Sequence, residues 1–492
     1  MPLWPGRIVV TTLQFTPSQE GISQMQFNHT TSALSAAFDD SNLVSAAGLV
    51  PVMRLAERAG LSALTQKHLT VPTDKGANAG AKIMSLVAGM LAGADSIEDM
   101  RLLRHGGMRR LFDRVYAPST LGSFLRSFEF GHVRQLDAVA ARFLTGLTAV
   151  SPDLLPAGVG YTCVDIDDTI IEVEGYLKQG ASFGYSGVRG LNAVLAIAST
   201  PESAPVILTQ RLRKGSTSSA RGAKRVVSDA LAVLKRLPAT GPRQVLLRAD
   251  SAYYSHAVVS AARHAGADVS VTVRMNPSIK QAIASIQDAA WAPIEYPGST
   301  RDEETGRLIS RAEVAEIPYT AFTSKKGQQI TGRLVVRRIP ELGPKALREQ
   351  PTLFDTWRFH AFFTTVAADE LDTITVDQTH RRHAVIEQVN ADLKASALAH
   401  LPSGKYAANA AWLVLAVIAF NLTRAAAVIA DPGGKLRRAV TATIRRTLIN
   451  VPARIARSAR KLRLHLPEHW PWATEWAALL THSTSPPGIS IP

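Results

Sequence analysis

The sequence predicts an α/β protein in which a mixed-sheet core is interrupted by a β-rich insertion and flanked by helical regions at both ends. Residues 161–275 alternate between strand and helix patterns, and residues 45–145 show apolar residues at a 3.6-residue period. A predicted helix at 377–397, with one polar face and one apolar face, follows a further β-rich stretch. Alternation of this kind is typical of a sheet covered by helices.

The composition favours a polyanionic partner. The chain has 492 residues, is 46% hydrophobic and 19% charged, and carries a net charge of +15. A globular protein this basic suits DNA or RNA better than an acidic small molecule. The single cysteine, Cys163, excludes a disulfide framework or a Cys-based zinc site within the chain and fits a reducing compartment.

No membrane span is predicted. The most apolar run, residues 407–422, is shorter than the roughly 20 residues that a spanning helix needs. It also contains Asn409 and Asn421, so a buried core helix is the expectation.

The N-terminal part divides into two regions. Residues 1–40 are expected to be a poorly ordered leader, and Met25 offers a second possible start. Residues 41–155 read as short amphipathic helices with many basic residues. Two roles stay open for them, DNA binding or helical packing and oligomerisation.

The core is expected in two parts, residues 156–276 and 376–430. The first part reads as three strands, a helix, a strand, a helix and a strand, and a final helix opens the second part. This is the element order of an RNase H-like fold. Residues 277–375 are expected to form a separate β-rich lobe, and 431–492 a helical basic region with ten Lys and Arg between 435 and 463.

One helix carries an unusual polar stripe. In "HRRHAVIEQVNADLKA", His380, His383, Glu387 and Lys394 fall within roughly 40° of one line along the helix. The apolar residues lie about a quarter turn or more away, so one face can pack while the other points into a site. A solvated polar face is the competing interpretation.

Acidic residues stand where strands of the predicted sheet place them near this helix. Asp165 and Asp167 lie on the same face of the first strand, because they are two residues apart, and Asp250 ends the fourth strand. Asp168 is expected to point to the opposite face. With Glu387, these carboxylates could converge, and convergent carboxylates suit Mg²⁺.

The chain resembles the DDE transposases of bacterial insertion sequences, in the group whose β-rich insertion lies between the second Asp and the Glu. Asp167-Asp168-Thr169 matches the family's Asp-x-Thr, and "RADSAYYS" matches the second motif. The third motif is Tyr-x2-Arg-x3-Glu-x6-Lys. Glu387 and Lys394 match its last two positions, whereas histidines occupy the first two.

The resemblance implies Asp167, Asp250 and Glu387 as catalytic residues and ligands of two Mg²⁺ ions, which Mn²⁺ can replace. Asp165 is kept as a reserve for the first position. The resemblance also implies contacts to DNA, for which the candidates are His380, Arg381, Arg382, His383, Lys394, Arg189 and Lys214.

The same resemblance implies cleavage at the element's terminal inverted repeats, transfer of the 3′ end into target DNA, and a homodimer that holds two ends. It implies a bacterial, cytoplasmic, nucleoid-associated protein. Two other classes remain: a zinc hydrolase using His380, His383 and Glu387, and a non-catalytic DNA-binding protein derived from a transposase.

Overall fold

The computed structural model describes residues 28, 33–72, 74–158, 160–239, 243–301, 306, 308–340, 357–459 and 461–485. Residues from Ser41 onward form one compact unit, and residues 1–40 form another. Most of the predicted leader, including Met25, lies outside the described residues. The description below therefore concerns the unit that begins at Ser41.

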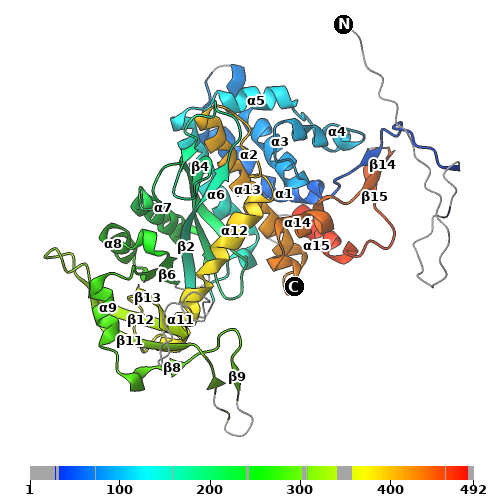
Figure 1. Ribbon diagram of the computed structural model, residues 1–492. Helices are drawn as coiled ribbons and strands as arrows, with labels where there is room; N and C mark the ends of the chain where they lie inside the picture. Colours follow the sequence, from blue (N-terminus) through cyan, green and yellow to red (C-terminus); the bar gives the residue numbers. More distant parts are fainter. Residues whose placement is uncertain are drawn as a thin grey trace, which may run out of the picture. The chain divides into compact units, whose positions relative to one another are not determined.

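A mixed sheet forms the centre of this unit (Figure 1). Its core strands are β2 (Tyr161–Glu172), β3 (Ser182–Phe183), β4 (Arg189–Ser199), β5 (Val206–Lys214), β6 (Gln244–Ala249) and β7 (Asp268–Thr272). The order runs β3-β4-β2-β6-β7, and β5 also pairs with β4. The first three long strands are antiparallel, whereas β6 is parallel to both β2 and β7. The predicted succession of strands and helices is confirmed in this region.

Two helices pack against the sheet, one between β5 and β6 in the chain and the other between β6 and β7. They are α7 (Ala223–Arg236) and α8 (His256–His264). The residues Val226, Val227, Ala230 and Leu234 of α7 are buried at the spacing of one helix face, and α7 contacts β2, β4 and β5. This layer leaves the other face of β2 for a later helix.

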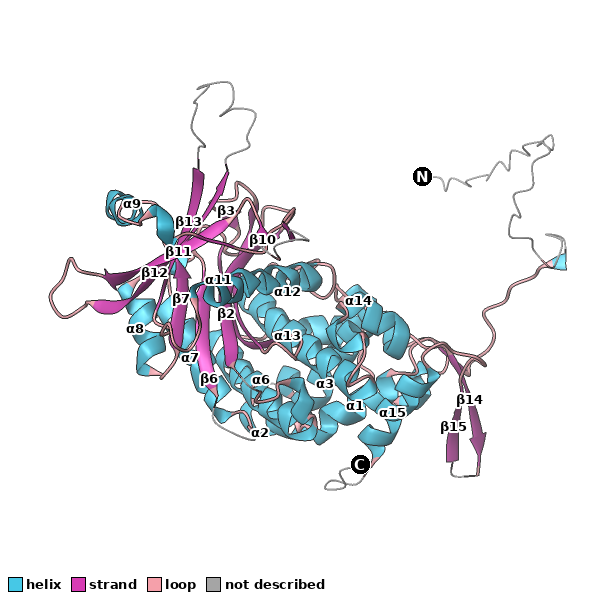
Figure 2. Ribbon diagram, turned by 90° about the horizontal axis from the view of Figure 1, so that it is seen from below, coloured by secondary structure: helices cyan, strands magenta, loops and turns pink. Residues whose placement is uncertain are grey.

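The insertion continues the central sheet. It contains α9 (Pro277–Ala284), β8 (Ala292–Pro293), β9 (Thr300–Arg301), β10 (Leu308–Ile309), β11 (Glu313–Ala321), β12 (Ile330–Pro340) and β13 (Trp357–Thr364). Strand β13 pairs antiparallel with β7, and β12, β11 and β8 follow in order (Figure 2). The prediction of a separate lobe is therefore wrong, because its strands satisfy the free edge of β7. The core strands nevertheless remain adjacent to one another.

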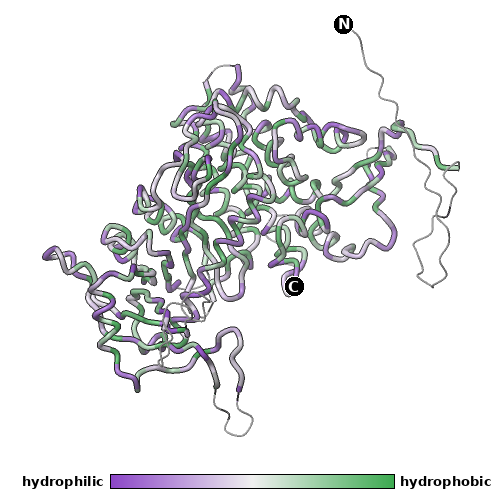
Figure 3. Tube along the Cα trace, in the orientation of Figure 1, coloured by the Kyte–Doolittle hydropathy of each residue, from purple (hydrophilic) through white to green (hydrophobic). Residues whose placement is uncertain are grey.

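The helical region surrounds one long apolar helix, α13 (Tyr406–Ala430). The region also contains α1 (Leu49–Arg58), α2 (Leu61–His68), α3 (Ala79–Ala92), α4 (Met108–Leu111), α5 (Pro118–Arg126) and α6 (Phe130–Val150). Among the described residues, α13 is the one helix long and apolar enough to cross a membrane, but 94% of its apolar window is buried inside the protein. It contacts α1, α3, α5 and α6, and the hydrophobic colouring of Figure 3 runs through this interior. The predicted core helix is confirmed, and the N-terminal helices share its core.

Asn421 explains how a polar residue fits inside α13. The pairing of β4 with β5 shifts register between Ala196 and Ile197, which leaves Ile207 beside an irregular part of the strand. The Asn421 side chain accepts a hydrogen bond from the Ile207 N–H at 2.9 Å and donates one to the Ile207 carbonyl at 2.8 Å. Buried backbone groups need partners, so this amide fixes α13 on the sheet.

The C-terminal region is only partly helical. It contains α14 (Thr441–Ile444), a π-helical turn at Arg445–Ile449, a hairpin of β14 (Ala453–Ser458) and β15 (Lys461–His465), and α15 (Ala473–Thr484). Strand β1 (Leu43–Val44) pairs with β14, so the order of this small sheet is β1-β14-β15. The prediction of a helical basic region is therefore wrong over the hairpin.

Candidate active site

Asp167 and Asp250 line one cleft of about 1050 Å³. Strands β2 and β6 are parallel, with Ile166 opposite Ala249, so the next residue of each chain segment is one of these two acids. Crevices beyond the carboxyl ends of parallel strands are common ligand sites. The structure therefore brings the first two predicted carboxylates together.

Asp167 is held in a negative environment. Burial raises the pKa of Asp167 to about 6, and the neighbouring charges of Asp168 and Asp250 act in the same direction. Ionisation of the Asp167 carboxyl near neutral pH is therefore less favourable in free energy than ionisation of an ordinary aspartate. A bound cation would favour the ionised form. The donor set fits a hard divalent ion, since such ions prefer oxygen ligands.

The helix opposite β2 is broken into three pieces. These are α11 (Thr373–Arg381), a 3₁₀ turn at Arg382–Ala384 and α12 (Val385–Lys394), where the sequence predicted one continuous helix. Helix α12 and the turn before it lie alongside β2. Asn390 Nδ2 lies 3.3 Å from an oxygen of Asp167, and Lys394 Nζ lies 3.3 Å from Thr169 Oγ1. His383 and Lys394 of the predicted polar stripe thus contact β2.

Glu387 stands on this stripe, one turn before Asn390. Its side chain is exposed and does not line the cleft that holds Asp167 and Asp250. Within the described ranges, no three His, Cys, Asp or Glu side chains are arranged to hold a metal ion. The structure therefore places Glu387 on the expected helix face without bringing its carboxylate to the other two.

Asp165 is a buried partner of Arg248. Arg248 donates from Nε and Nη2 to the two carboxylate oxygens, each at 2.7 Å, and the exposed fractions of the two side chains are 0% and 2%. His383 Nδ1 lies 2.9 Å from the same carboxylate. Burial alone would raise the pKa of Asp165, but the charge of Arg248 and the His383 hydrogen bond lower it below its ordinary value. Both oxygens of this carboxylate are therefore occupied by contacts to Arg248 and His383.

The pairing of His383 with Asp165 predicts a pH dependence of stability. Burial would lower the pKa of His383, but the hydrogen bond and charge of Asp165 raise it above its ordinary value. A histidine with a raised folded-state pKa contributes stability that is complete below about 6.5 and is lost as the pH rises through the higher value. The free energy of unfolding of the wild type should therefore decline with rising pH in this range. We expect His383→Gln to remove the part of that decline that is due to His383, as measured by urea unfolding. The exposed His469, changed to Gln, is the control and should leave the decline as it is.

If the free energy of unfolding declines equally with rising pH in wild type and His383→Gln, the pairing of His383 with Asp165 is contradicted.

Asp168 lies on the other face of β2, as the alternation of strand side chains predicts. It accepts hydrogen bonds from the Tyr253 hydroxyl at 2.7 Å and from the Asn192 amide, and Arg213 pairs with it at 3.3 Å. Burial beside this carboxylate raises the pKa of Tyr253 well above its ordinary range. The expected orientation of Asp168 is confirmed, and its contacts anchor the segment that follows Asp250.

His380 packs against the sheet and not into the cleft. Its Nδ1 lies 2.8 Å from Ser270 Oγ and its Nε2 lies 3.1 Å from Thr272 Oγ1, while the ring stacks on Phe362 at 4.0 Å. Burial lowers the pKa of His380 well below its ordinary value, so the ring is neutral. Both ring nitrogens thus have hydroxyl partners, and this geometry gives no support to His380 as a phosphate contact or a zinc ligand.

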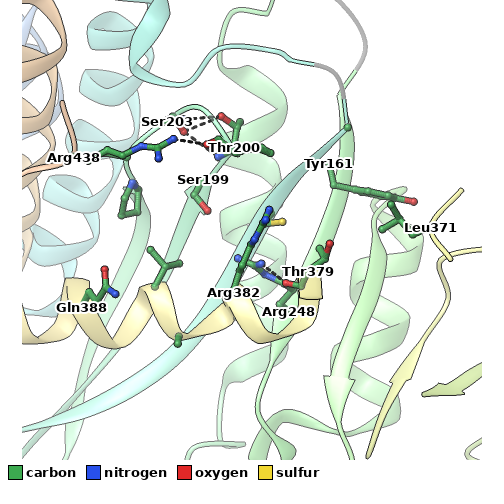
Figure 4. Close-up of a pocket in the computed structure, with 17 residues that line it drawn as sticks. Tyr161, Ser199, Thr200, Ser203, Arg248, Leu371, Thr379, Arg382, Gln388 and Arg438 are labelled. Carbon is green, nitrogen blue, oxygen red and sulfur yellow. Dashed lines mark hydrogen bonds between the residues drawn. The ribbon is translucent and has the colours of Figure 1, made fainter. Parts of the chain in front are cut away.

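Three arginines predicted to contact DNA lie away from this cleft. Arg381 donates to Asp377 at 2.8 Å, and Arg189 donates to the Gly175 carbonyl at 2.7 Å. Arg382 lines a second hollow of about 730 Å³ beside the start of β2, together with Arg438 and Arg248 (Figure 4). Arg381 and Arg189 are therefore held by protein groups, and Arg382 faces a different hollow.

Cations lie at the cleft and an amide contacts Asp167, and the sequence indicated these residues only in part. Lys394 lines the cleft, and exposed Lys214 precedes the 215–220 segment of its wall. Arg274 also lines it and was not predicted, because nothing local distinguishes it from other surface arginines. Asn390 was missed although it lies on the stripe of Glu387 and Lys394. Its Oδ1 is buried and has no hydrogen-bond partner.

Comparison with known protein families identifies the chain. The family model for transposase DDE domain group 1 matches residues 28–484, whereas the comparison with curated proteins returned no match. Members of this family bind DNA, have nuclease and transesterification activity in general, and generally depend on divalent metal ions. With a match over nearly the whole sequence, the chain belongs to the DDE transposases of domain group 1.

Proposed function

We propose that the protein cleaves phosphodiester bonds at the ends of a bacterial insertion sequence and transfers the freed 3′ ends into target DNA. The observation that carries the proposal is the pairing of Asp167 with Asp250 in one cleft beneath the polar face of α12. We assign the strand order β5-β4-β2-β6-β7, followed by α12, to an RNase H-like core. In that core the first strand and the end of the fourth supply the two acids.

Asp167, Asp250 and Glu387 would hold the divalent ions, two Mg²⁺ or Mn²⁺ in our proposal. Such ions supply charge neutralisation for the attacking and leaving oxygens of an in-line displacement. The raised pKa of Asp167 and the unpartnered oxygen of Asn390 support a cation at this place. Glu387 would complete the set by turning from solvent toward the cleft, since His383 and Lys394, on the same predicted stripe, already contact β2.

The chain's own residues position the DNA and the carboxylates. Asn390 donates to Asp167 and orients it, and Lys394 stands beside Thr169 at the cleft wall. Lys394, Arg274 and Lys214 would pair with phosphates of the bound strand. Positioning and neutralisation are the main requirements of phosphodiester displacement, because little covalent chemistry is asked of the protein.

We further propose that the active form is a homodimer, since two element ends must be held together for transfer. The protein would act on chromosomal DNA in the bacterial cytoplasm. The net charge of +15 supports association with a polyanion of this kind.

A metal-dependence assay on end-containing DNA tests the function. A duplex carrying the DNA that flanks the gene, with its inverted repeat, is incubated with the protein and either Mg²⁺, Mn²⁺ or Zn²⁺. We expect 3′-OH ends and joining to a target plasmid with Mg²⁺ or Mn²⁺, because hard oxygen ligands favour these ions over zinc. Cleavage with Zn²⁺ alone would instead point to a hydrolase. Binding without cleavage under all three ions would point to a non-catalytic DNA-binding protein.

A further inference from the structure

The hairpin of β14 and β15, here called the basic ribbon, has two unlike faces. In an antiparallel pair, residues directly opposite each other lie on the same face. Arg454 is opposite His465, Ala456 is opposite Arg463, and Ser458 is opposite Lys461. These six residues form the open face of the ribbon, and Ile455, Leu464, Arg457 and Leu462 form the other.

The second face is attached to the helical region at its base. Ile455 is 4% exposed, and the space at Gly107 is so tight that an added Cβ would lie 3.0 Å from Ile455 Cδ1. The Gly107 N–H donates to the Leu43 carbonyl at 2.7 Å, and the Ile455 N–H donates to the Asn42 carbonyl at 2.9 Å. The ribbon is therefore fixed at its base by Ile455 and by β1.

The open face carries charge of one sign. Lys461, Arg463 and Arg454 are exposed on it, and the sequence holds no Asp or Glu between residues 432 and 467. An ordinary solvated face mixes both signs, and a protein-binding face usually has an apolar centre. Neither description fits this face, whereas a phosphate backbone would complement it.

The ribbon is remote from the carboxylate cleft. In Figures 1 and 2 it lies on the opposite side of the helical region from β2 and β6. It also forms the edge of its small sheet, since among the described strands β15 pairs with β14 alone. A two-stranded ribbon is narrow enough to follow a groove of duplex DNA.

We propose that the open face of the basic ribbon binds the phosphate backbone of duplex DNA at a second site, separate from the cleft of Asp167 and Asp250. The inference rests on the proposed function for its choice of DNA as the partner. It adds the assignment of a surface that positions DNA without taking part in strand cleavage.

The test compares two variants that each remove two positive charges from a hairpin. Lys461→Gln/Arg463→Gln alters the open face, and Lys325→Gln/Lys326→Gln alters the exposed turn between β11 and β12. Binding of a random duplex is measured by fluorescence anisotropy with EDTA, in wild type and both variants, between about 50 and 200 mM salt. Thermal unfolding confirms that each variant is folded.

We expect the ribbon variant to lower the slope of log affinity against log salt by about 2, because each lost phosphate contact removes about 0.9. The turn variant should keep the wild-type slope. An unchanged slope in the ribbon variant, or an equal loss in both variants, overturns the proposal. Aggregation of the ribbon variant with an unchanged slope would also overturn it, since the cations would then only protect a strand edge.

Failure of the proposed function is detected separately. If Asp167→Asn still cleaves DNA while the ribbon variant shows the lowered salt slope, the assignment of the cleft fails and the second DNA site stands. If Asp167→Asn abolishes cleavage while the ribbon variant binds as wild type, the second site fails alone.

Discussion

Replacement of Asp167 by asparagine is expected to abolish strand cleavage and to leave DNA binding largely intact. The variant keeps the shape of the side chain but removes a negative oxygen ligand from the cleft shared with Asp250. We expect a loss of at least about 10²–10³-fold, the range found when one group that stabilises a charged transition state is removed. Cleavage of end-containing DNA and its binding in EDTA are the two measurements.

The exposed Asp153, changed to asparagine, is the matched control and should retain activity. In EDTA, Asp167→Asn should also be more stable than wild type above about pH 6. A carboxyl with a raised folded-state pKa costs stability as the pH rises from its unfolded value of 3.8 to its folded value of about 6, and asparagine does not ionise. Retained cleavage would move the first ligand to Asp165 or Asp168.

Replacement of Arg248 by methionine is expected to destabilise the protein by about 3–5 kcal/mol, because it leaves the buried charge of Asp165 without its bidentate partner. The loss should also affect the site. Arg248 Nη1 donates to the Thr379 carbonyl at 2.6 Å, so the same residue ties β6 to α11 just before the turn that leads to Glu387. Urea unfolding gives the stability, and cleavage activity of the folded fraction gives the second effect.

The matched control is Arg101→Met. Arg101 pairs with Glu98 at 2.9 Å, but both side chains are largely exposed, and such pairs contribute at most about 1 kcal/mol. Combining Arg248→Met with Asp165→Leu should recover part of the lost stability, because no buried charge is left unpaired. Arg248→Met with the stability of wild type would show that Asp165 does not depend on this pair.

Local patterns were sufficient for the core strands and for α13. The 2-residue and 3.6-residue periods of residues 161–275 depend on which side chains face the interior, and that is visible in the sequence. The alternation of β2 likewise predicted the opposite orientations of Asp167 and Asp168, which contact Asn390 and Tyr253 respectively, although both residues line the cleft. Strand pairing beyond β7 was not visible, because nothing local tells a strand of the insertion to join β7 rather than to form its own sheet.

The hairpin of β14 and β15 was mistaken for a helix for a physical reason. Arginines recur every three residues from 454 to 463, a spacing close to that of a helix face. Pairing of Leu43 with Arg454 outweighs that local preference. The contacts of His380 and Arg248 could not be predicted from the sequence either, since each depends on residues more than 80 positions away in the chain.

The sharing of one core by the two ends of this unit affects how the protein must be made. Strand β1 needs β14 as its partner, and α1 packs against α15, which is more than 400 residues later in the chain. On the ribosome, at about 5–20 residues per second, the part of α1 that packs against α15 therefore stays exposed for tens of seconds. Contacts this far apart in sequence slow folding. A chaperone that shields nascent apolar helices is therefore expected to raise the yield of active transposase. The gain should be larger than for a protein whose domains fold one after another during synthesis.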